Sequence, residues 1–427
     1  MRAAFPPFSA SAFAMGAGLV LGLSVLAACT NSGSPGRTPA SPGVSTGPIT
    51  IGASLPLTGD FSADGQAFKN GYQLWASDVN AHGGIGGRKV KLTILNDGSS
   101  QNQVVTNYQR LFGADHVDLA FGPFSSLLTS PASSVAARYG MAFVEGAGGA
   151  PSVFDTPSNQ ADHNVFDVSL PIADELVPFV HWIASLPPSQ RPKTAAFPMA
   201  QDPFADPPVQ LAQTLLQKLH IQTVYSKVFP EEVASYKPAA DQVAASGAQL
   251  VVLGSTDVPT VSAFMQAFKQ QHYTPKMFIA AAGPDQGGAF TSAVGVGNAN
   301  GMMVPNGWYP GYANAASQKM VQEYVAKFGG HADDVNADVA EAYSVGQVLA
   351  QAVTATGGTD NAKIISYLHS GVTLSSVQGP VKFDALGENG AAASFIFQWQ
   401  KGSFKQVLPA GMPGSVAITA TKPPWAA

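Results

Sequence analysis

Two adjacent serines, Ser125 and Ser126, are the residues whose type and position most directly suggest chemistry. They lie in "AFGPFSSLLTSPASS" (120–134), where an apolar run ends on a glycine and a small-residue helix is predicted to begin near Thr129. Hydroxyls at such a junction fit a nucleophile, or a donor to a bound anion that the free amides and positive dipole end of the helix assist. The two roles imply different classes of protein.

The sequence offers few of the other groups that catalysis needs. No GxSxG pattern surrounds the serines and no HExxH motif is present, while the eight histidines are scattered. We therefore expect neither a metal nor a cofactor, and no enzyme. An exported hydrolase with Ser126 as its nucleophile is the enzymatic alternative.

The net charge and the length of the chain limit which classes of protein remain. The chain has 427 residues, a net charge of -5 and 11% charged residues, with no basic block. Nucleic-acid binding is not expected, because it needs a concentrated positive surface. The length suggests two or three domains.

The first 48 residues have the composition of an export signal followed by a tether. Residues 10–28 carry no charge and end in Leu26-Ala27-Ala28-Cys29, which resembles the lipobox of bacterial lipoproteins. We expect a signal peptide over 1–28, then a lipidated Cys29 and a flexible Ser/Gly/Pro-rich linker over 29–48. An uncleaved membrane helix is the alternative. Cys29 is the only cysteine, so the exported protein has no internal disulfide.

From residue 49, short apolar runs alternate with segments of helical periodicity. Phe68, Tyr72, Trp75 and Val79 fall on one helical face. This alternation predicts parallel sheets covered by helices on both faces. Strands are predicted at 49–55, 89–96, 117–122, 141–145, 194–199, 223–229, 249–254, 276–281 and 301–307. The intervening "HGGIGGRKV" follows a helix and precedes a strand, so it is a helix end and turn and not a dinucleotide fingerprint.

A series of short motifs runs along the chain from residue 49. Its opening carries, in order, Pro56-Leu57-Thr58-Gly59, Gly65, Asn70-Gly71, Asn80, Gly83-Gly84-Ile85, Gly87 and Asp97. Later segments are "GPFSSLLTSPAS", "GAGGAPSVF", "AAAGPD" and "VQGPVKFDALGENGAAASFIFQW". With these motifs, the segment from residue 49 to 405 resembles the branched-chain amino-acid-binding proteins of ABC transporters.

The resemblance implies an α/β fold of the type I periplasmic binding-protein class, with two Rossmann-like lobes joined by crossing hinge segments. We expect the first lobe at 49–170 and 288–378, the second at 171–287 and 379–412, and a C-terminal tail at 413–427. A small polar ligand, an amino acid or a related amide or carboxylate, would lie in the cleft between the lobes. Hinge closure would bury it.

Four residues take ligand-binding roles from the resemblance. The serine matching Ser126 donates to the ligand's α-carboxylate in relatives, and Ala147 falls where main-chain groups hold the ligand. Asp285 matches an acidic residue that pairs with the ligand's ammonium group, although it fits a turn cap equally. Gly149 stands where relatives often have a threonine, so it is either a permissive turn residue or a source of space for a larger ligand.

Five further residues are candidates for the cleft. Phe204 and Thr256 stand near tyrosine positions of the family, and Asp64 stands where relatives often carry an aromatic residue, with a helix N-cap as its alternative. Trp308 and Tyr343 are aromatic residues that would enclose ligand, or else pack in the core.

Some relatives also carry a disulfide at the positions of Ser99 and Ser125. Both cysteines are absent here, so we expect hydrogen bonds to hold these loops, and we assign Ser125 to the lost disulfide and not to the ligand.

The resemblance implies a monomeric, extracytoplasmic solute-binding lipoprotein on the outer face of the cytoplasmic membrane. Its partners would be the small ligand, an ABC permease with its ATPase subunits, and the membrane through the lipid on Cys29. A ligand sensor on the same fold, signalling to a membrane partner, is the alternative.

Overall fold

The computed structural model describes residues 47–426 except 231, 232 and 313. The predicted signal peptide and Cys29 lie outside the described residues, as does the linker apart from Gly47 and Pro48. Among the described residues, no helix is both long and apolar enough to cross a membrane.

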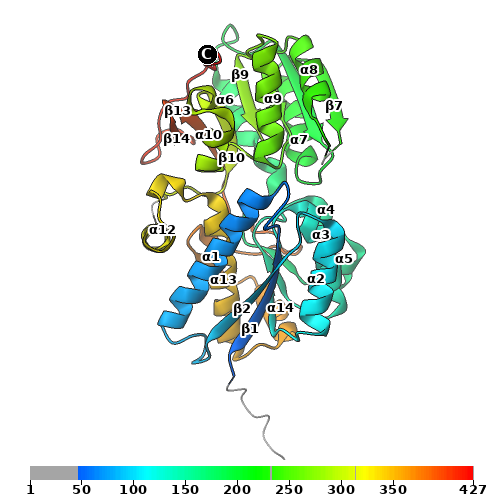
Figure 1. Ribbon diagram of the computed structural model, residues 1–427, viewed down its shortest axis with the longest axis vertical. Coiled ribbons are helices and arrows are strands. Elements are labelled where there is room, and N and C mark those ends of the chain that lie inside the picture. Colours follow the sequence, from blue (N-terminus) through cyan, green and yellow to red (C-terminus); the bar gives the residue numbers. More distant parts are fainter. Residues whose placement is uncertain (1–46, 231–232, 313, 427) are drawn as a thin grey trace, which may run out of the picture. The chain divides into compact units, whose positions relative to one another are not determined.

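Two mainly parallel sheets form the framework, and each belongs to one lobe (Figure 1). The first has the order β2-β1-β3-β4-β5 and the second β14-β13-β10-β9-β8-β6-β7. The first sheet contains β1 (Ile49–Leu55), β2 (Val90–Asn96), β3 (Leu119–Phe121), β4 (Phe143–Glu145) and β5 (Val165–Asp167). The second contains β6 (Thr194–Ala200), β7 (Gln222–Phe229), β8 (Leu250–Leu253), β9 (Met277–Ala280), β10 (Met302–Asn306), β13 (Phe395–Gln400) and β14 (Ser403–Leu408).

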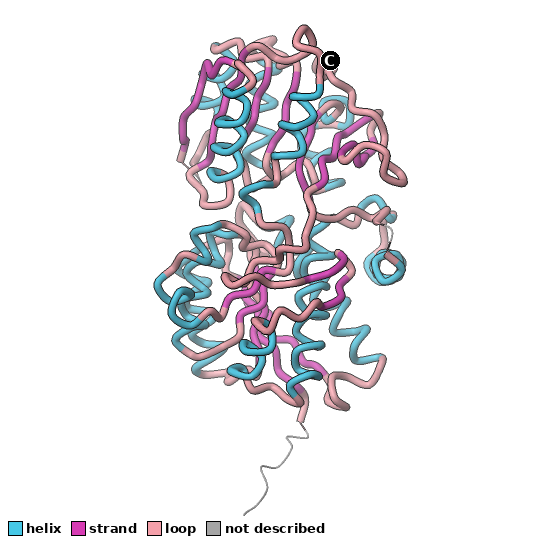
Figure 2. The backbone as a smooth tube through the Cα atoms, turned by 180° about the vertical axis from the view of Figure 1, so that it is seen from behind, coloured by secondary structure: helices cyan, strands magenta, loops and turns pink. Residues whose placement is uncertain are grey.

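Helices cover both faces of each sheet, as Figure 2 shows from the opposite side. The first lobe contains α1 (Ser62–Ala81), α2 (Gln101–Gly113), α3 (Ser126–Arg138), α4 (Pro151–Phe154), α5 (Pro157–Asp162), α12 (Ala315–Phe328), η2 (Ala332–Asp334), α13 (Ala337–Thr356) and α14 (Asn361–Leu368). The second contains η1 (Ile172–Asp174), α6 (Val177–Ser185), α7 (Asp206–Lys218), α8 (Lys237–Ala245), α9 (Val258–Gln270), α10 (Gly287–Val294) and α11 (Val296–Ala299). A small hairpin of β11 (Leu374–Ser376) and β12 (Gly379–Val381) completes the first lobe.

Right-handed crossovers explain which helix lies on which face. The chain leaves β1 towards β2 on one side and then returns past β1 to β3 on the other, so α1 and α2 lie on opposite faces. Accordingly, α1 packs against α13, whereas α2 packs against α3. The order reverses beside β1, and in the second sheet it reverses beside β6. Such reversals leave a crevice outside the carboxyl ends of the strands.

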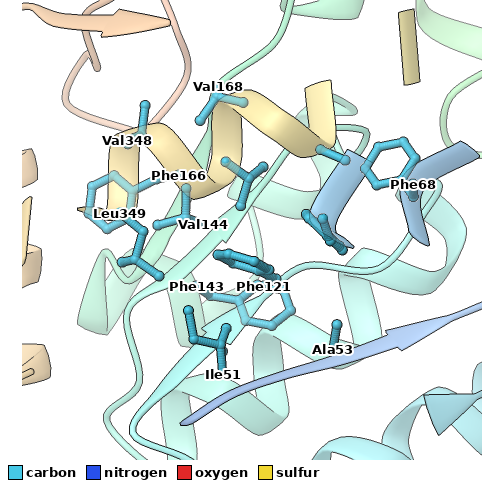
Figure 3. Packing of buried hydrophobic residues seen from close by; sticks show 14 of the residues in the cluster. Ile51, Ala53, Phe68, Phe121, Phe143, Val144, Phe166, Val168, Val348 and Leu349 are labelled. Carbon is cyan, nitrogen blue, oxygen red and sulfur yellow. The ribbon is translucent and has the colours of Figure 1, made fainter. Parts of the chain in front are cut away.

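The first sheet packs its side chains into a continuous apolar core (Figure 3). Ile51 and Ala53 of β1, Phe121 of β3 and Phe143 of β4 are almost fully buried, as is Leu349 from α13. Near-continuous burial along β1 is expected for a parallel strand covered on both faces. All nine strands predicted from the sequence form, although their ends differ by up to two residues.

The lobe boundaries lie later in the chain than the sequence suggested. β10 pairs in parallel with β9, so residues 288–306 belong with the second lobe and not with the first. β12 pairs with β11, and Val381 and Phe383 pack in the core of the first lobe. The first lobe therefore extends beyond residue 378. The described part of the tail packs on the second lobe, where the Lys422 ammonium donates to the carbonyls of Asn298 and Asn300.

Candidate functional site

A cavity of about 90 Å³ lies where the carboxyl ends of strands from both sheets meet. From 49–170 and 337–356 it is lined by Asp64, Phe124, Ser125, Gly146, Ala147, Gly149, Asp167, Ser169, Leu170, Asp338 and Glu341. From 171–307 it is lined by Ile172, Glu175, Phe204, Thr256, Ala281, Ala282, Asp285, Gln286, Pro305, Asn306 and Gly307.

The serine pair divides in the opposite way from the sequence prediction. Ser125 lines the cavity and caps α3, since its hydroxyl accepts a hydrogen bond from the Leu128 amide at 3.4 Å. Its φ of 73° is rare for a residue with a side chain. Ser126 is fully buried away from the cavity lining, and its hydroxyl accepts from the Ala150 amide at 3.1 Å. Helix α3 begins at Ser126 and not near Thr129, so Ser126 makes an internal hydrogen bond where a ligand contact was expected.

The loop after β4 is organised by a carboxylate of the protein itself. Glu145, at the end of β4, is fully buried, and its Oε2 accepts from the amides of Ala147 at 2.8 Å and Gly148 at 2.5 Å. Ala147 lines the cavity as predicted, but Glu145 already holds its N–H. Burial, and then repulsion from Asp167, raises the pKa of Glu145 well above its usual value.

Gly149 lies against Asp167, which is the last residue of β5. A Cβ at position 149 would come within 2.9 Å of Asp167 Oδ2 and 3.0 Å of the Leu170 carbonyl oxygen. The glycine is thus required by close approach, and it leaves room beside the carboxylate. Asp167 Oδ1 accepts from the Ser169 amide at 2.8 Å, whereas Oδ2 has no hydrogen-bond partner among the described residues.

The other wall includes the three predicted residues of the second lobe, Asp285, Thr256 and Phe204. Asp285 lines the cavity, and its Oδ1 accepts from the Gly283 amide at 2.9 Å, which is the turn-capping contact that was its alternative role. Its Oδ2 accepts from Asn306 Nδ2 at 3.1 Å. Thr256 is almost fully buried, and Phe204 packs against the apolar core of the first lobe.

Asp64 meets two acidic residues of α13 at the cavity. It lies in the first turn of α1, one turn past the N-cap position, where its carboxyl group is hydrogen-bonded to that of Asp338. Asp338 also accepts from Gln286 Nε2 at 2.8 Å. Glu341 follows three residues later on α13 and so shares the face of Asp338.

Six carboxyl groups therefore line one cavity, and no lysine, arginine or histidine is among the described residues that line it. Burial is the main cause that raises the pKa of Asp167 and of Asp338 to about 7, and of Asp285 to about 6. Burial together with repulsion between the carboxylates raises the pKa of the others well above the usual range: Asp64, Glu175 and Glu341. The cavity is thus an environment that favours positive charge.

Trp308 and Tyr343, the two aromatic residues predicted to enclose ligand, do not line the cavity. The indole Nε1 of Trp308 donates to Ser317 Oγ at 2.9 Å, and the ring is buried. The hydroxyl of Tyr343 donates to Asp78 Oδ2 at 2.8 Å where α13 packs against α1. Both side chains have the core-packing role that was their alternative.

The cavity between two α/β lobes agrees with the comparisons of this chain with known proteins. Residues 48–403 match the family described as periplasmic binding protein. The chain belongs to this family. Since it is a family of binding proteins, the prediction that the chain is not an enzyme is confirmed, and Ser126 has no catalytic role to fill.

Two relatives show how far the likeness to this periplasmic binding protein extends. An amino acid binding protein of Pseudomonas aeruginosa is 23% identical over 363 residues, which cover 84% of this chain and 92% of the relative. A Leu/Ile/Val-binding protein homolog 7 of Brucella melitensis is 23% identical over 386 residues, covering 84% and 91%.

Solved structures confirm the predicted fold of the periplasmic binding protein. The substrate binding protein LivJ of Streptococcus pneumoniae, in complex with isoleucine, has a TM-score of 0.71 at 16% identity and covers 84% of this chain and 97% of its own. A solute binding protein of R. palustris, in complex with benzoate, has a TM-score of 0.71 at 16% identity and covers 88% and 99%. One fold therefore holds ligands of different chemistry.

Sequence reasoning missed several residues that line the cavity of this periplasmic binding protein. Asp167 follows the short apolar run "VF", and an acid at a strand end is a signal that was available. Asp338 and Glu341 are spaced by three in the alanine-rich "ADVAEAY", which places two acids on one helical face. No sequence pattern of this kind marks Glu175, because it follows the short turn η1 and not a strand. Among the described residues, no group of three or more His, Cys, Asp or Glu is arranged to hold a metal ion.

Proposed function

We propose that this periplasmic binding protein is the extracytoplasmic solute-binding component of an ABC importer, anchored to the membrane through a lipid on Cys29. It captures a small polar ligand, an amino acid or a related compound, between its two lobes and presents it to the permease. The observation that carries this proposal is the small cavity, lined by acidic and apolar side chains, to which both lobes contribute.

The relatives support the importer role. The Pseudomonas protein is named for binding amino acids, and the Brucella protein is named a homolog of Leu/Ile/Val-binding proteins. LivJ is described as a branched-chain amino acid transporter substrate binding protein, and the benzoate complex as part of an ABC transporter.

Within the cavity, we assign ligand contacts to six of the nine predicted residues: Asp64, Ala147, Gly149, Phe204, Thr256 and Asp285. Ser125 replaces Ser126 in this set, since it is the serine that lines the cavity. Phe204 offers an apolar surface, whereas the aspartates offer acceptors for ligand amines.

A thermal-shift screen of the full chain against amino acids, amines, amides and small carboxylates tests the binding function. A ligand at a hundred times its dissociation constant stabilises the folded state by about 2.7 kcal/mol. We expect at least one compound to raise the melting temperature and to lose that effect in Asp285→Asn. If no small solute in the panel shifts the melt, the solute-binding proposal is wrong.

The lipid anchor is tested separately in cells. We expect the protein to incorporate a labelled fatty acid and to fractionate with membranes, and Cys29→Ala to do neither. Labelling that persists in Cys29→Ala would contradict the anchor and leave the binding function untouched.

A further inference from the structure

We infer that the ligand is a small organic dication, carrying two amine or guanidine groups and no carboxylate, held between carboxylates on both walls of the cavity. This inference rests on the proposed solute-binding function and specifies the class of solute.

Two unpartnered carboxylate oxygens mark where positive groups would bind. Asp167 Oδ2 and Glu175 Oε1 have no hydrogen-bond partner among the described residues. Both residues line the cavity and are at least nine-tenths buried, at 1% and 4% exposure. Buried acceptors without donors are costly, and a ligand N–H group would satisfy them. Asp167 lies before the chain first crosses from the first lobe to the second, and Glu175 lies after that crossing.

Four amides beside the cavity that could receive a ligand carboxylate are already occupied. The amides of Ala147 and Gly148 donate to Glu145, and the Ala150 amide donates to Ser126. The Leu128 amide donates to Ser125. To use these four amides, a ligand carboxylate would have to displace their internal acceptors, and it would meet repulsion inside a cavity lined by six acids.

The carboxylates come from both walls of the cavity. Asp64, Asp167, Asp338 and Glu341 line it from 49–170 and 337–356, whereas Glu175 and Asp285 line it from 171–307. Carboxylates on two walls match two separated positive groups better than one.

The rest of the lining favours an organic cation over a metal ion. Calcium takes six to eight oxygen ligands in one shell, and magnesium an octahedron. Here the acids are interleaved with apolar side chains, among them Phe124, Leu170, Ile172 and Phe204. Such surfaces suit the hydrocarbon that separates two amine groups.

The test compares compounds that differ only in a carboxylate. Isothermal titration of the full chain would use cadaverine against lysine and agmatine against arginine, with leucine, calcium chloride and magnesium chloride as further arms. We expect at least one decarboxylated compound to bind about tenfold or more tightly than its amino acid, the ratio that one charge-assisted contact supplies.

Isosteric variants connect the binding to the named groups. Asp167→Asn and Glu175→Gln should each weaken diamine binding by about tenfold or more, since each removes one charged acceptor. Asp97→Asn is the matched control. Asp97 is also a buried acid with a raised pKa, but it bonds Ser54 and Ser99 outside the cavity lining, and its variant should bind as the wild type does.

Three results would overturn the inference. These are tighter binding of lysine or arginine than of its decarboxylated partner, binding of leucine or a metal ion without the diamines, or no diamine binding. Leucine binding would leave the proposed function standing, whereas failure of the whole solute panel would remove both.

Discussion

At the scale of single residues, one backbone angle decides which serine lines the cavity. Ser125 and Ser126 have the same side chain, and both follow the apolar strand β3. The positive φ of Ser125 turns the chain into α3 and leaves Ser125 at the cavity, whereas Ser126 faces Ala150 in the interior. Strain of this kind persists only where the surrounding structure enforces it.

Replacing Ser126 should therefore affect stability more than binding. In Ser126→Ala the buried amide of Ala150 loses its acceptor, so the free energy of unfolding should fall by about 1–3 kcal/mol in urea denaturation. Ser134→Ala, at a partly exposed position of the same helix, should leave stability nearly unchanged. Unchanged stability in Ser126→Ala together with lost ligand binding would contradict the structural role.

At the scale of elements, close packing of α1 on α13 positions three of the six cavity acids, Asp64, Asp338 and Glu341. Small residues allow this approach. A Cβ on Gly346 would lie 2.2 Å from the Trp75 ring, and one on Gly71 would lie 2.6 Å from the Val339 carbonyl oxygen. The helices therefore meet almost backbone to backbone.

Adding one methyl group at this contact should separate the two helices. Gly346→Ala should lower the free energy of unfolding by about 1–3 kcal/mol, because the ring of Trp75 has no free space to move into. Gly288→Ala is the control. It adds the same atom on the exposed surface of α10, where nothing lies within 4 Å, and should stabilise by up to about 1 kcal/mol. Equal melting temperatures for the two variants would contradict this account of the packing.

At the scale of the whole molecule, buried acids make stability depend on pH. Folding raises the pKa of Asp167, Asp202 and Asp338 to about 7 and of Asp97 and Asp285 to about 6. It also raises the pKa of Asp64, Glu145, Glu175 and Glu341 well above the usual values of these groups. The folded state then binds more protons than the unfolded state between about pH 4 and pH 7, so the free energy of unfolding falls as pH rises through this window.

The ligand-free protein should accordingly be more stable near pH 5 than near pH 8. Urea denaturation at a series of pH values measures this slope, which should be shallower in Asp167→Asn because one of the shifted groups is removed. Hydrogen bonds from Tyr343 and Lys319 lower the pKa of Asp78, and a hydrogen bond from Lys237 lowers the pKa of Asp241. These two groups make the free energy of unfolding rise with pH, but only at lower pH. Stability that rises from pH 5 to pH 8 would show that the cavity acids are not shifted upwards.

The amino-acid sequence by itself determined the layered α/β fold and nine of its strands. Apolar runs such as 49–55 and the helical spacing of Phe68, Tyr72 and Trp75 are local patterns, and local patterns are enough to specify which segments are strands and which are helices. The resemblance of the sequence to a known family also placed several cavity residues, Asp285 among them.

Only the tertiary structure decided the character of the cavity. Asp64, Asp167, Glu175 and Asp338 are far apart in the sequence, and no local pattern places the four of them around one cavity. Their convergence depends on sheet order and on the positions where the chain crosses between the lobes, such as the pairing of β10 with β9. Burial and repulsion act on these groups through space, which is why six carboxylates around one ligand cavity emerge only when the chain is folded.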